Sequence, residues 1–255
     1  MTGTAFIWHG SPMNAIEENI YTQSWKEIGT QLWNPQAILV VSSHWVTHGI
    51  TEIGWSNNPK IIYDMYWFPD ELYNQIYSPI GSNKIAQEIQ EYLWWETKIN
   101  LNRWLDHGIW SILCHIFPDW SIPIIPMSID YKKPPVYHFE LWKKLQYLRK
   151  KNIAIIGSGN FVHNLSLLDW WNSTKNRWAI DFNEKIISSI NKRDFDAILN
   201  FESWWNISKL SHPSTDHLLP LLTILWTIRE DDSIKFYTSE IVLWSLWMTS
   251  LYISQ

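Results

Sequence analysis

Short apolar runs alternate along the chain with longer stretches of helical spacing. Continuous apolar runs predict buried strands, and these runs lie at Thr4–Trp8, Ala37–Val41, Ile122–Ile129 and Ile153–Ile156. Two more strands are expected near the carboxyl terminus, at Ile234–Tyr237 and Leu246–Ile253. Apolar residues that recur every three or four positions predict helices, at Asn14–Leu32, Ser82–Leu93, Ile109–Phe117, Pro134–Lys151, Arg177–Ile190 and Thr215–Ile228.

This alternation predicts the fold class. Strands separated by helices indicate an α/β fold, with a mixed and mostly parallel sheet flanked by helices. No linker, repeat or low-complexity tract divides the chain, so we expect a single domain over residues 1–255. The sequence has no apolar run of about 18 residues, and we therefore expect no membrane span.

Charge and cysteine content narrow the classes of partner and site. The net charge is −5, with 20 basic and 25 acidic residues, which argues against nucleic acid as a partner. The single cysteine, Cys114, excludes a disulfide scaffold and a cysteine metal cluster and fits a reducing, cytoplasmic compartment. The sequence leaves the oligomeric state open.

Several of the nine histidines lie where predicted strands end. His9, His44 and His163 each follow a buried strand, and ligands of open α/β sheets bind at the carboxyl ends of strands. His217 precedes a predicted helix, and His107 lies in a loop before another. Neutral imidazoles suit zinc, copper, iron or nickel. Each histidine alone is more simply interpreted as a loop or core residue, so this pattern leaves both interpretations open.

The remaining polar candidates are weaker. Three histidines are interpreted as structural or surface residues, namely His48, His115 and His138. His212 could line a pocket or position the turn at Pro213. Four carboxylates lie near predicted loops: Asp64, Asp106, Asp130 and Asp216. Neither the Gly157–Asn160 segment nor Ser11 beside His9 stands in a dinucleotide or nucleophile-elbow pattern.

Six segments, in this order along the chain, resemble the class III extradiol ring-cleavage dioxygenases, in particular their 4,5-DOPA dioxygenase branch. The segments cover nearly the whole chain. They are His9-Gly10-Ser11-Pro12-Met13-Asn14, Ser42-Ser43-His44-Trp45, Leu105-Asp106-His107-Gly108-Ile109-Trp110-Ser111, Met127-Ser128-Ile129-Asp130, Gly157-Ser158-Gly159-Asn160-Phe161-Val162-His163-Asn164 and His212-Pro213-Ser214-Thr215-Asp216-His217-Leu218-Leu219-Pro220-Leu221.

The resemblance implies a role for each of five histidines. It implies a metal held by His9, His44 and His217, while His163 falls at the acid–base position and is a further candidate ligand. His107 corresponds to a second pocket histidine that interacts with substrate or oxygen. The family works with Fe(II), and members are also seen with zinc. Since many iron oxygenases use two histidines and one carboxylate, Asp216 is the competing ligand to test.

The implied activity is metal-dependent extradiol cleavage of a small aromatic catechol, such as DOPA, by O₂. This chemistry needs a metal with open coordination positions and a base for a catechol proton, which a neutral histidine provides. Zinc cannot cycle electrons, so a zinc-loaded form should be inactive in this reaction. Two alternatives stay open: a zinc-dependent hydrolase on the same histidines, and a non-catalytic scaffold of the same fold.

Tryptophan is unusually common and glycine unusually scarce, at 20 and 9 residues of 255. Six tryptophans occupy positions where the family usually carries glycine: Trp8, Trp67, Trp104, Trp142, Trp226 and Trp244. Four more are similar candidates: Trp94, Trp95, Trp171 and Trp247. We hypothesise a genetic code that reads one stop codon as glycine. Ten exchanges would leave 10 tryptophans and 19 glycines, close to the usual glycine share of about 7%.

Overall fold

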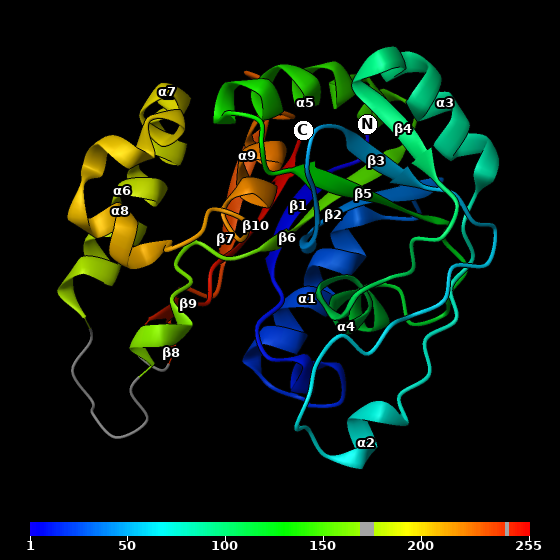
Figure 1. The fold of residues 1–255 in the computed structure, drawn as a ribbon, viewed down its shortest axis with the longest axis horizontal. Helices are drawn as coiled ribbons and strands as arrows, with labels where there is room; N and C mark the ends of the chain where they lie inside the picture. The colour runs from blue at the N-terminus through cyan, green and yellow to red at the C-terminus, as the bar shows by residue number, and fades with distance from the viewer. Residues whose placement is uncertain (169–175, 243–244) are drawn as a thin grey trace.

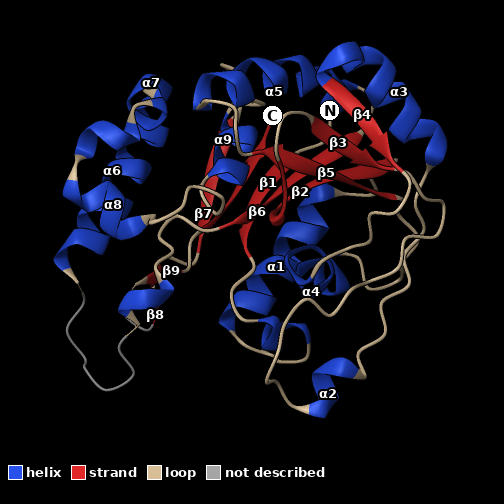
Figure 2. Cartoon of the chain, in the orientation of Figure 1, coloured by secondary structure: helices blue, strands red, loops and turns tan. Residues whose placement is uncertain are grey.

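A computed structural model describes residues 1–168, 176–242 and 245–255. Its centre is an eight-stranded sheet with the order β4-β3-β5-β2-β6-β1-β10-β7 (Figures 1 and 2). A separate pair, β8–β9, forms a small second sheet. The strands are β1 (Thr4–Trp8), β2 (Ala37–Thr47), β3 (Thr51–Gly54), β4 (Thr97–Asn100), β5 (Ile124–Asp130), β6 (Ile153–Gly159), β7 (Ser233–Tyr237), β8 (Ile241–Val242), β9 (Leu246–Trp247) and β10 (Ser250–Ser254).

The middle of the large sheet is parallel and its edges are mixed. Strands β5, β2, β6 and β1 are consecutive parallel neighbours, and β3–β4 is also parallel. The pairs β1–β10, β10–β7 and β3–β5 are antiparallel. The predicted mixed, mostly parallel α/β sheet is therefore confirmed, and three of its parallel strands, β2, β6 and β1, end side by side.

Helices cover both faces of this sheet (Figure 2). Helices α1 and α4 pack on one face, α3, α5 and α9 on the other, and α6 to α8 extend the second layer sideways (Figure 1). The helices are α1 (Ile20–Leu32), α2 (Asp70–Tyr73), α3 (Asn83–Leu93), α4 (His107–Ile116), α5 (Pro135–Lys150), α6 (Arg177–Lys192), α7 (Phe195–Leu199), α8 (Asn206–Ser211) and α9 (Leu219–Leu225). Among the described residues, no helix is both long and apolar enough to cross a bilayer.

Alternating side chains of the central strands feed two cores, one on each face. In β1, Phe6 joins the core under α5 and α9, whereas Ala5 and Ile7 join the core under α1 and α4. All three are fully buried, because a strand sends successive side chains to opposite faces. A sheet covered on both sides needs apolar residues at every position, which explains the continuous apolar runs in the sequence.

Several predicted boundaries are wrong, and local polar contacts explain most of them. The helix expected from Asn14 begins at Ile20, because Asn19 forms a capping box with Thr22. The helix expected from Thr215 begins at Leu219, after a turn in which the Leu218 amide donates to the Thr215 carbonyl at 2.9 Å.

Other differences concern elements that the apolar pattern did not separate. The strand expected over Leu246–Ile253 divides into β9 and β10. Strands β3 and β4, of four residues each, were not predicted because they are short and mix polar with apolar positions. His107, expected in a loop, is the first residue of α4, which follows the cap residue Asp106.

Left-handed backbone conformations gather at tryptophans. Nine non-glycine residues with positive φ are found among the described residues, and five of them are tryptophan: Trp33, Trp67, Trp94, Trp120 and Trp205. Only a few per cent of non-glycine residues adopt positive φ, and those are enriched in asparagine and aspartate rather than in bulky side chains. Two of the proposed glycine positions, 67 and 94, are thus in the conformation that glycine favours.

The other proposed glycine positions differ in their surroundings. Trp8 and Trp226 are buried, the first in β1 and the second after α9, and the indole nitrogen of Trp226 has no partner. Trp104 is exposed. Trp171 and Trp244 lie outside the described residues. Among the described residues, the tryptophans with positive φ therefore include only two of the ten proposed glycine positions, 67 and 94.

Exchanging Trp94 for glycine is expected to stabilise the chain by about 1 kcal/mol, because a backbone conformation that L-residues rarely adopt costs about 1–3 kcal/mol. Trp94 ends α3 with φ 53° and its side chain is exposed, so little packing is lost. The matched control is Trp95→Gly: Trp95 is equally exposed and has no positive φ, so its exchange should be neutral or destabilising. Denaturant unfolding of both variants measures the difference, and equal effects would contradict the assignment of strain to residue 94.

Candidate metal centre and catalytic pocket

The carboxyl ends of β1, β2 and β6 bring three histidines from distant parts of the chain to one edge of the sheet. His9 follows β1 directly, and His163 comes four residues after β6 ends at Gly159. His44 lies within β2, where the register with β5 shifts between Val41 and Val46. Such bulges redirect side chains next to functional sites. The fourth, His217, comes from the turn before α9.

His9, His44 and His217 form a group that could hold a metal ion. One ring nitrogen from each lies within 4.8 Å of the other two, and the Nε2 atoms of His9 and His44 are 3.1 Å apart. Two ligands at about 2.1 Å from one ion, at right angles to each other, would lie about 3 Å apart. Two lone pairs at this distance repel, so the spacing suits two nitrogens that share a proton or a cation.

The outer nitrogens of two of these rings are held by hydrogen bonds. His9 Nδ1 lies 2.9 Å from Ser158 Oγ, which in turn donates to the Gly108 carbonyl at 2.5 Å. Because the hydroxyl proton is used there, His9 Nδ1–H is the donor. His217 Nδ1–H donates to Asp216 Oδ2 at 2.6 Å. Both bonds leave Nε2 with a free lone pair, as metal ligands require.

Burial keeps these imidazoles neutral. Burial first, and the neighbouring histidines second, hold the pKa of His9 and of His44 well below the usual value of 6.5. Burial and His217 likewise lower the pKa of His163. A neutral ring offers a lone pair to a metal or to a substrate proton, so the donor set fits a resident metal ion.

Asp216 lies outside the group of three nitrogens and orients His217 instead. Burial alone would raise the pKa of Asp216, but the hydrogen bond from His217 brings it well below the usual value. An ionised carboxylate behind the outer nitrogen makes imidazole a stronger ligand. Asp216 was the competing ligand suggested by the sequence, and its geometry favours this supporting position.

Asp216→Asn is expected to weaken metal binding by about 10- to 100-fold, because an amide stabilises the imidazole less than a carboxylate does. Competition against a metal-binding dye measures the affinity. Asp196→Asn, an exchange in the distant helix α7, is the control of the same chemistry. Parent-like affinity of Asp216→Asn would remove Asp216 from the support of the site.

His163 lies beside the three grouped histidines. Its ring stacks on that of His217, with centroids 3.6 Å apart and an angle of 4° between the planes. Its backbone amide donates to the Ser211 carbonyl at 2.9 Å, which fixes the loop that presents it. His163 also lines the pocket in front of the group, so it can reach a bound molecule.

His107 occupies the other side of the group, at the start of α4. Its ring lies 4.0 Å from that of His44, measured between centroids. Asp64 Oδ1 accepts from the backbone amide of His107 at 2.9 Å and lies 3.1 Å from its Nδ1. Burial alone would raise the pKa of Asp64, but His107 brings it below the usual value. The sequence placed Asp64 near a loop and gave no sign of this pairing, since 43 residues separate the two.

His44, Asp64 and His107 form a second group of atoms within 4.8 Å of one another. Two histidines and one carboxylate are a known iron-binding set. However, Asp64 already accepts from the backbone and lies close to the Nδ1 of His107, whereas the hydrogen bonds at Nδ1 of His9 and His217 leave the Nε2 lone pairs of both rings available to an ion. We therefore take His9, His44 and His217 as the better candidate set.

A buried ion pair supports the strand that carries His44. Asp106 is fully buried, accepts from Ser42 Oγ at 2.6 Å and pairs with Arg103. Burial raises the pKa of Asp106, and Arg103 opposes that rise. Arg103 also stacks on the ring of Trp45. The Nε atom of Arg103 is buried without a hydrogen-bond partner among the described residues.

The remaining histidines make structural contacts. His115 and His138 lie close to the carbonyls of Asn14 and Asp130, at 2.7 and 3.1 Å, and His48 is exposed. His212 Nε2 lies 2.8 Å from the Phe161 carbonyl. His212 is not among the residues that line the pocket in front of the histidines, so of its two interpretations the structure favours the positioning of its turn.

A cavity of about 420 Å³ opens in front of the grouped histidines. Besides the histidines, its polar lining is Ser11 and Asn160. Five large apolar side chains outside β1 complete it: Met65, Phe68, Leu165, Leu168 and Leu246. The volume suits a small aromatic molecule.

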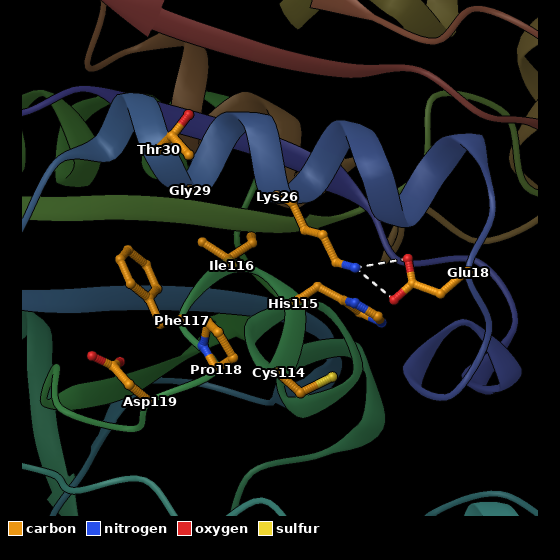
Figure 3. A pocket seen from close by; sticks show the side chains of 10 residues that line it. All are labelled: Glu18, Lys26, Gly29, Thr30, Cys114, His115, Ile116, Phe117, Pro118 and Asp119. Atoms are coloured by element: carbon orange, nitrogen blue, oxygen red, sulfur yellow. Dashed lines mark hydrogen bonds and ion pairs between the residues drawn. The ribbon is translucent and has the colours of Figure 1, made fainter.

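A larger cavity of about 750 Å³ lies between α1 and the end of α4 (Figure 3). Lys26 reaches across it to an ion pair with Glu18, above His115 (Figure 3). Burial raises the pKa of the nearby Cys114 thiol to about 12, so it is not a nucleophile at neutral pH. This cavity brings together no catalytic set.

Comparisons with known proteins agree with this geometry. Residues 4–243 match the family described as the catalytic LigB subunit of aromatic ring-opening dioxygenase. The chain is 38% identical over 255 residues to a 4,5-DOPA dioxygenase extradiol of Escherichia coli (strain K12), covering 97% of this chain and 93% of the relative. For a protein of the same name from Mirabilis jalapa the identity is 29% over 228 residues, covering 87% and 85%.

A solved structure shares the fold over the full length of the chain. It is the crystal structure of an uncharacterized protein from Escherichia coli K12, with a TM-score of 0.86, 34% identity and 100% of both chains covered. The resemblance to the extradiol dioxygenases found in the sequence is confirmed.

Proposed function

The chain belongs to the family of the catalytic LigB subunit of aromatic ring-opening dioxygenases and is an extradiol ring-cleaving dioxygenase, and we propose that it cleaves a small catechol with Fe(II) held by His9, His44 and His217. DOPA, cleaved at the 4,5 bond, is the reference substrate, because relatives that carry this name are similar over nearly the whole chain. The observation that carries the proposal is the convergence of one ring nitrogen from each of the three histidines within 4.8 Å at the floor of an aromatic-sized cavity.

Fe(II), when bound, would supply the redox chemistry that lets O₂ react with an aromatic ring, which zinc cannot do. The side chains around it bind and orient the substrate. The pocket walls exclude water from the ring, and Asn160 offers a neutral amide beside the histidines. Zinc is a possible occupant of the same nitrogens, and we expect that form to leave catechols intact.

We assign the proton transfers to His163. Its ring lines the pocket, and an imidazole in that position can take a catechol proton on entry of the substrate and return it to a departing oxygen. Its stacking on His217 and its amide bond to Ser211 hold the ring at the pocket wall. His107, held by Asp64 on the opposite side, is placed to contact the substrate or O₂.

The test loads the protein with Fe(II) under anaerobic conditions and then adds O₂ with DOPA and with other catechols. The expected result is a yellow ring-fission product that forms with Fe(II) and not with the zinc-loaded control. Absence of ring fission from every catechol would overturn the proposal. Zinc-dependent hydrolysis of esters or amides would favour a hydrolase instead, and failure to bind any metal would favour a scaffold.

We also propose a cytoplasmic location and the absence of a nucleic-acid partner. The single cysteine and the net charge of −5 support these two assignments. Fractionation of the native cells tests the first. A gel-shift assay against mixed nucleic acids tests the second.

A further inference from the structure

We propose that the preferred substrate is a catechol whose ring substituent is apolar and uncharged, such as a short alkyl chain, and that DOPA, the reference substrate of the relatives, is cleaved less efficiently. This inference rests on the proposed function and adds the chemical class of the substituent. It starts from the part of the cavity that lies beyond the histidines, where any group attached to the ring must be accommodated.

Three separate segments build that part of the cavity, and each contributes apolar side chains. Met65 and Phe68 come from the loop before α2, Leu165 and Leu168 from the segment after β6, and Leu246 from β9. These five residues surround the space in front of the histidines with hydrocarbon and one aromatic ring. An alkyl group placed there loses its contact with water, which favours binding.

No lysine or arginine is found among the described residues that line the cavity. Arg103 pairs with Asp106 and stacks on the ring of Trp45, and it is not among the described residues that line the cavity. A carboxylate on the substrate would therefore lose water without gaining an ionic partner, which is costly.

The test compares two catechols that differ mainly in one end group, 4-ethylcatechol and 3,4-dihydroxyphenylacetate, with DOPA as a third. For the Fe(II)-loaded protein we expect kcat/KM to be at least about tenfold higher for 4-ethylcatechol than for the acid, and also higher for 4-ethylcatechol than for DOPA. Lengthening the alkyl chain should raise it roughly fourfold per methylene until the cavity is full. Equal or better turnover of the acid would overturn the inference.

Anaerobic binding of the same catechols separates this inference from the proposed function. If ring fission fails but 4-ethylcatechol still binds at least about tenfold more tightly than the acid, the activity is wrong and the pocket assignment holds. If ring fission proceeds and the acid binds as tightly, the activity holds and the pocket assignment is wrong.

A positive charge introduced at the exposed edge of the cavity tests where the substituent of the catechol lies. Leu165 is 57% exposed, so Leu165→Lys should fold, and we expect it to raise kcat/KM for the acid about two- to fivefold relative to 4-ethylcatechol. Leu165→Gln is the neutral polar control and should leave that ratio unchanged. An unchanged ratio in Leu165→Lys would overturn the placement of the substituent against this wall.

A second inference rests on backbone geometry alone. We infer that residues 33, 67, 94, 120 and 205 are glycines in the native polypeptide, although the sequence as written has tryptophan there. All five have φ between 28° and 69° and all five side chains are exposed. Positions 33, 120 and 205 are not among the ten that composition and family resemblance suggested, so the backbone identifies them independently.

Two of these positions directly follow helices. Trp33 follows α1 with φ 28° and ψ 96°, and Trp94 follows α3 with φ 53° and ψ −127°. Glycine adopts such positive-φ conformations without the steric cost that a side chain brings. Trp67 is fully exposed and precedes Phe68, which lines the cavity. A glycine at 67 gives this wall of the cavity a backbone that moves without steric cost.

Peptide mass mapping of protein purified from its native cells tests this inference. We expect glycine at the five positions and an intact mass well below 30.4 kDa. Trp25 and Trp110 are fully buried and serve as internal controls that should read as tryptophan. Tryptophan at all five positions would overturn the inference, and so would glycine at positions 25 and 110 as well, because backbone conformation would then not distinguish the two groups.

Discussion

Replacing His44 or His217 by alanine is expected to weaken metal binding by more than about 100-fold and to reduce ring cleavage to background, because each exchange removes a proposed ligand and not merely its support. The three nitrogens lie within 4.8 Å of one another, and each exchange leaves only two of them. Metal content after dialysis, together with kcat on a catechol, measures the two effects.

His48→Ala is the matched control for these variants. His48 is four residues beyond His44 and exposed, so its loss should change neither metal content nor turnover. Thermal unfolding with and without a chelator shows whether the alanine variants still fold. A variant of His44 or His217 that retains the parent's metal content would remove that histidine from the ligand set.

The convergence of histidines could be predicted because it depends on the simplest feature of the fold. Buried parallel strands leave a clear apolar signature, and their carboxyl ends lie together whenever the strands are neighbours. This rule alone places His9, His44 and His163 at the same end of the sheet. It does not predict the role of each ring, because it says nothing about the orientation of the side chains.

The residues that orient the rings could not be read from the sequence. The predicted strand ends at Ile156, but β6 continues through Ser158. The Ser158 hydroxyl lies beside His9 and Gly108. Asp64 is paired with a residue 43 positions away. Such contacts are set by tertiary packing, and local periodicity carries no information about them. The predicted start of the first helix was wrong for a different reason. The apolar spacing of a helix begins at Asn14, but the polar cap at Asn19 sets the first turn at Ile20.

Replacing His163 by glutamine is expected to lower kcat by about 10²- to 10⁴-fold while metal content stays at the parent level, because general acid–base catalysis contributes about this much. His163 lines the cavity and stacks on His217, but its nitrogens are outside the group of three. Glutamine keeps a polar side chain of similar length and cannot exchange protons near neutral pH. Turnover of a catechol, metal content and anaerobic catechol binding are measured on the same preparation.

The pattern of losses distinguishes the two roles that the sequence left open for His163. A loss of turnover with retained metal and retained catechol binding identifies a proton-transfer group. A parallel loss of metal, like that expected for His217→Ala, identifies a fourth ligand. His107→Gln provides the comparison, because its ring faces His44 from the opposite wall and its loss should weaken binding of the substrate or of O₂ more than proton transfer. Full turnover of His163→Gln would contradict the acid–base assignment, since no other described histidine lines the cavity outside the ligand set except His107.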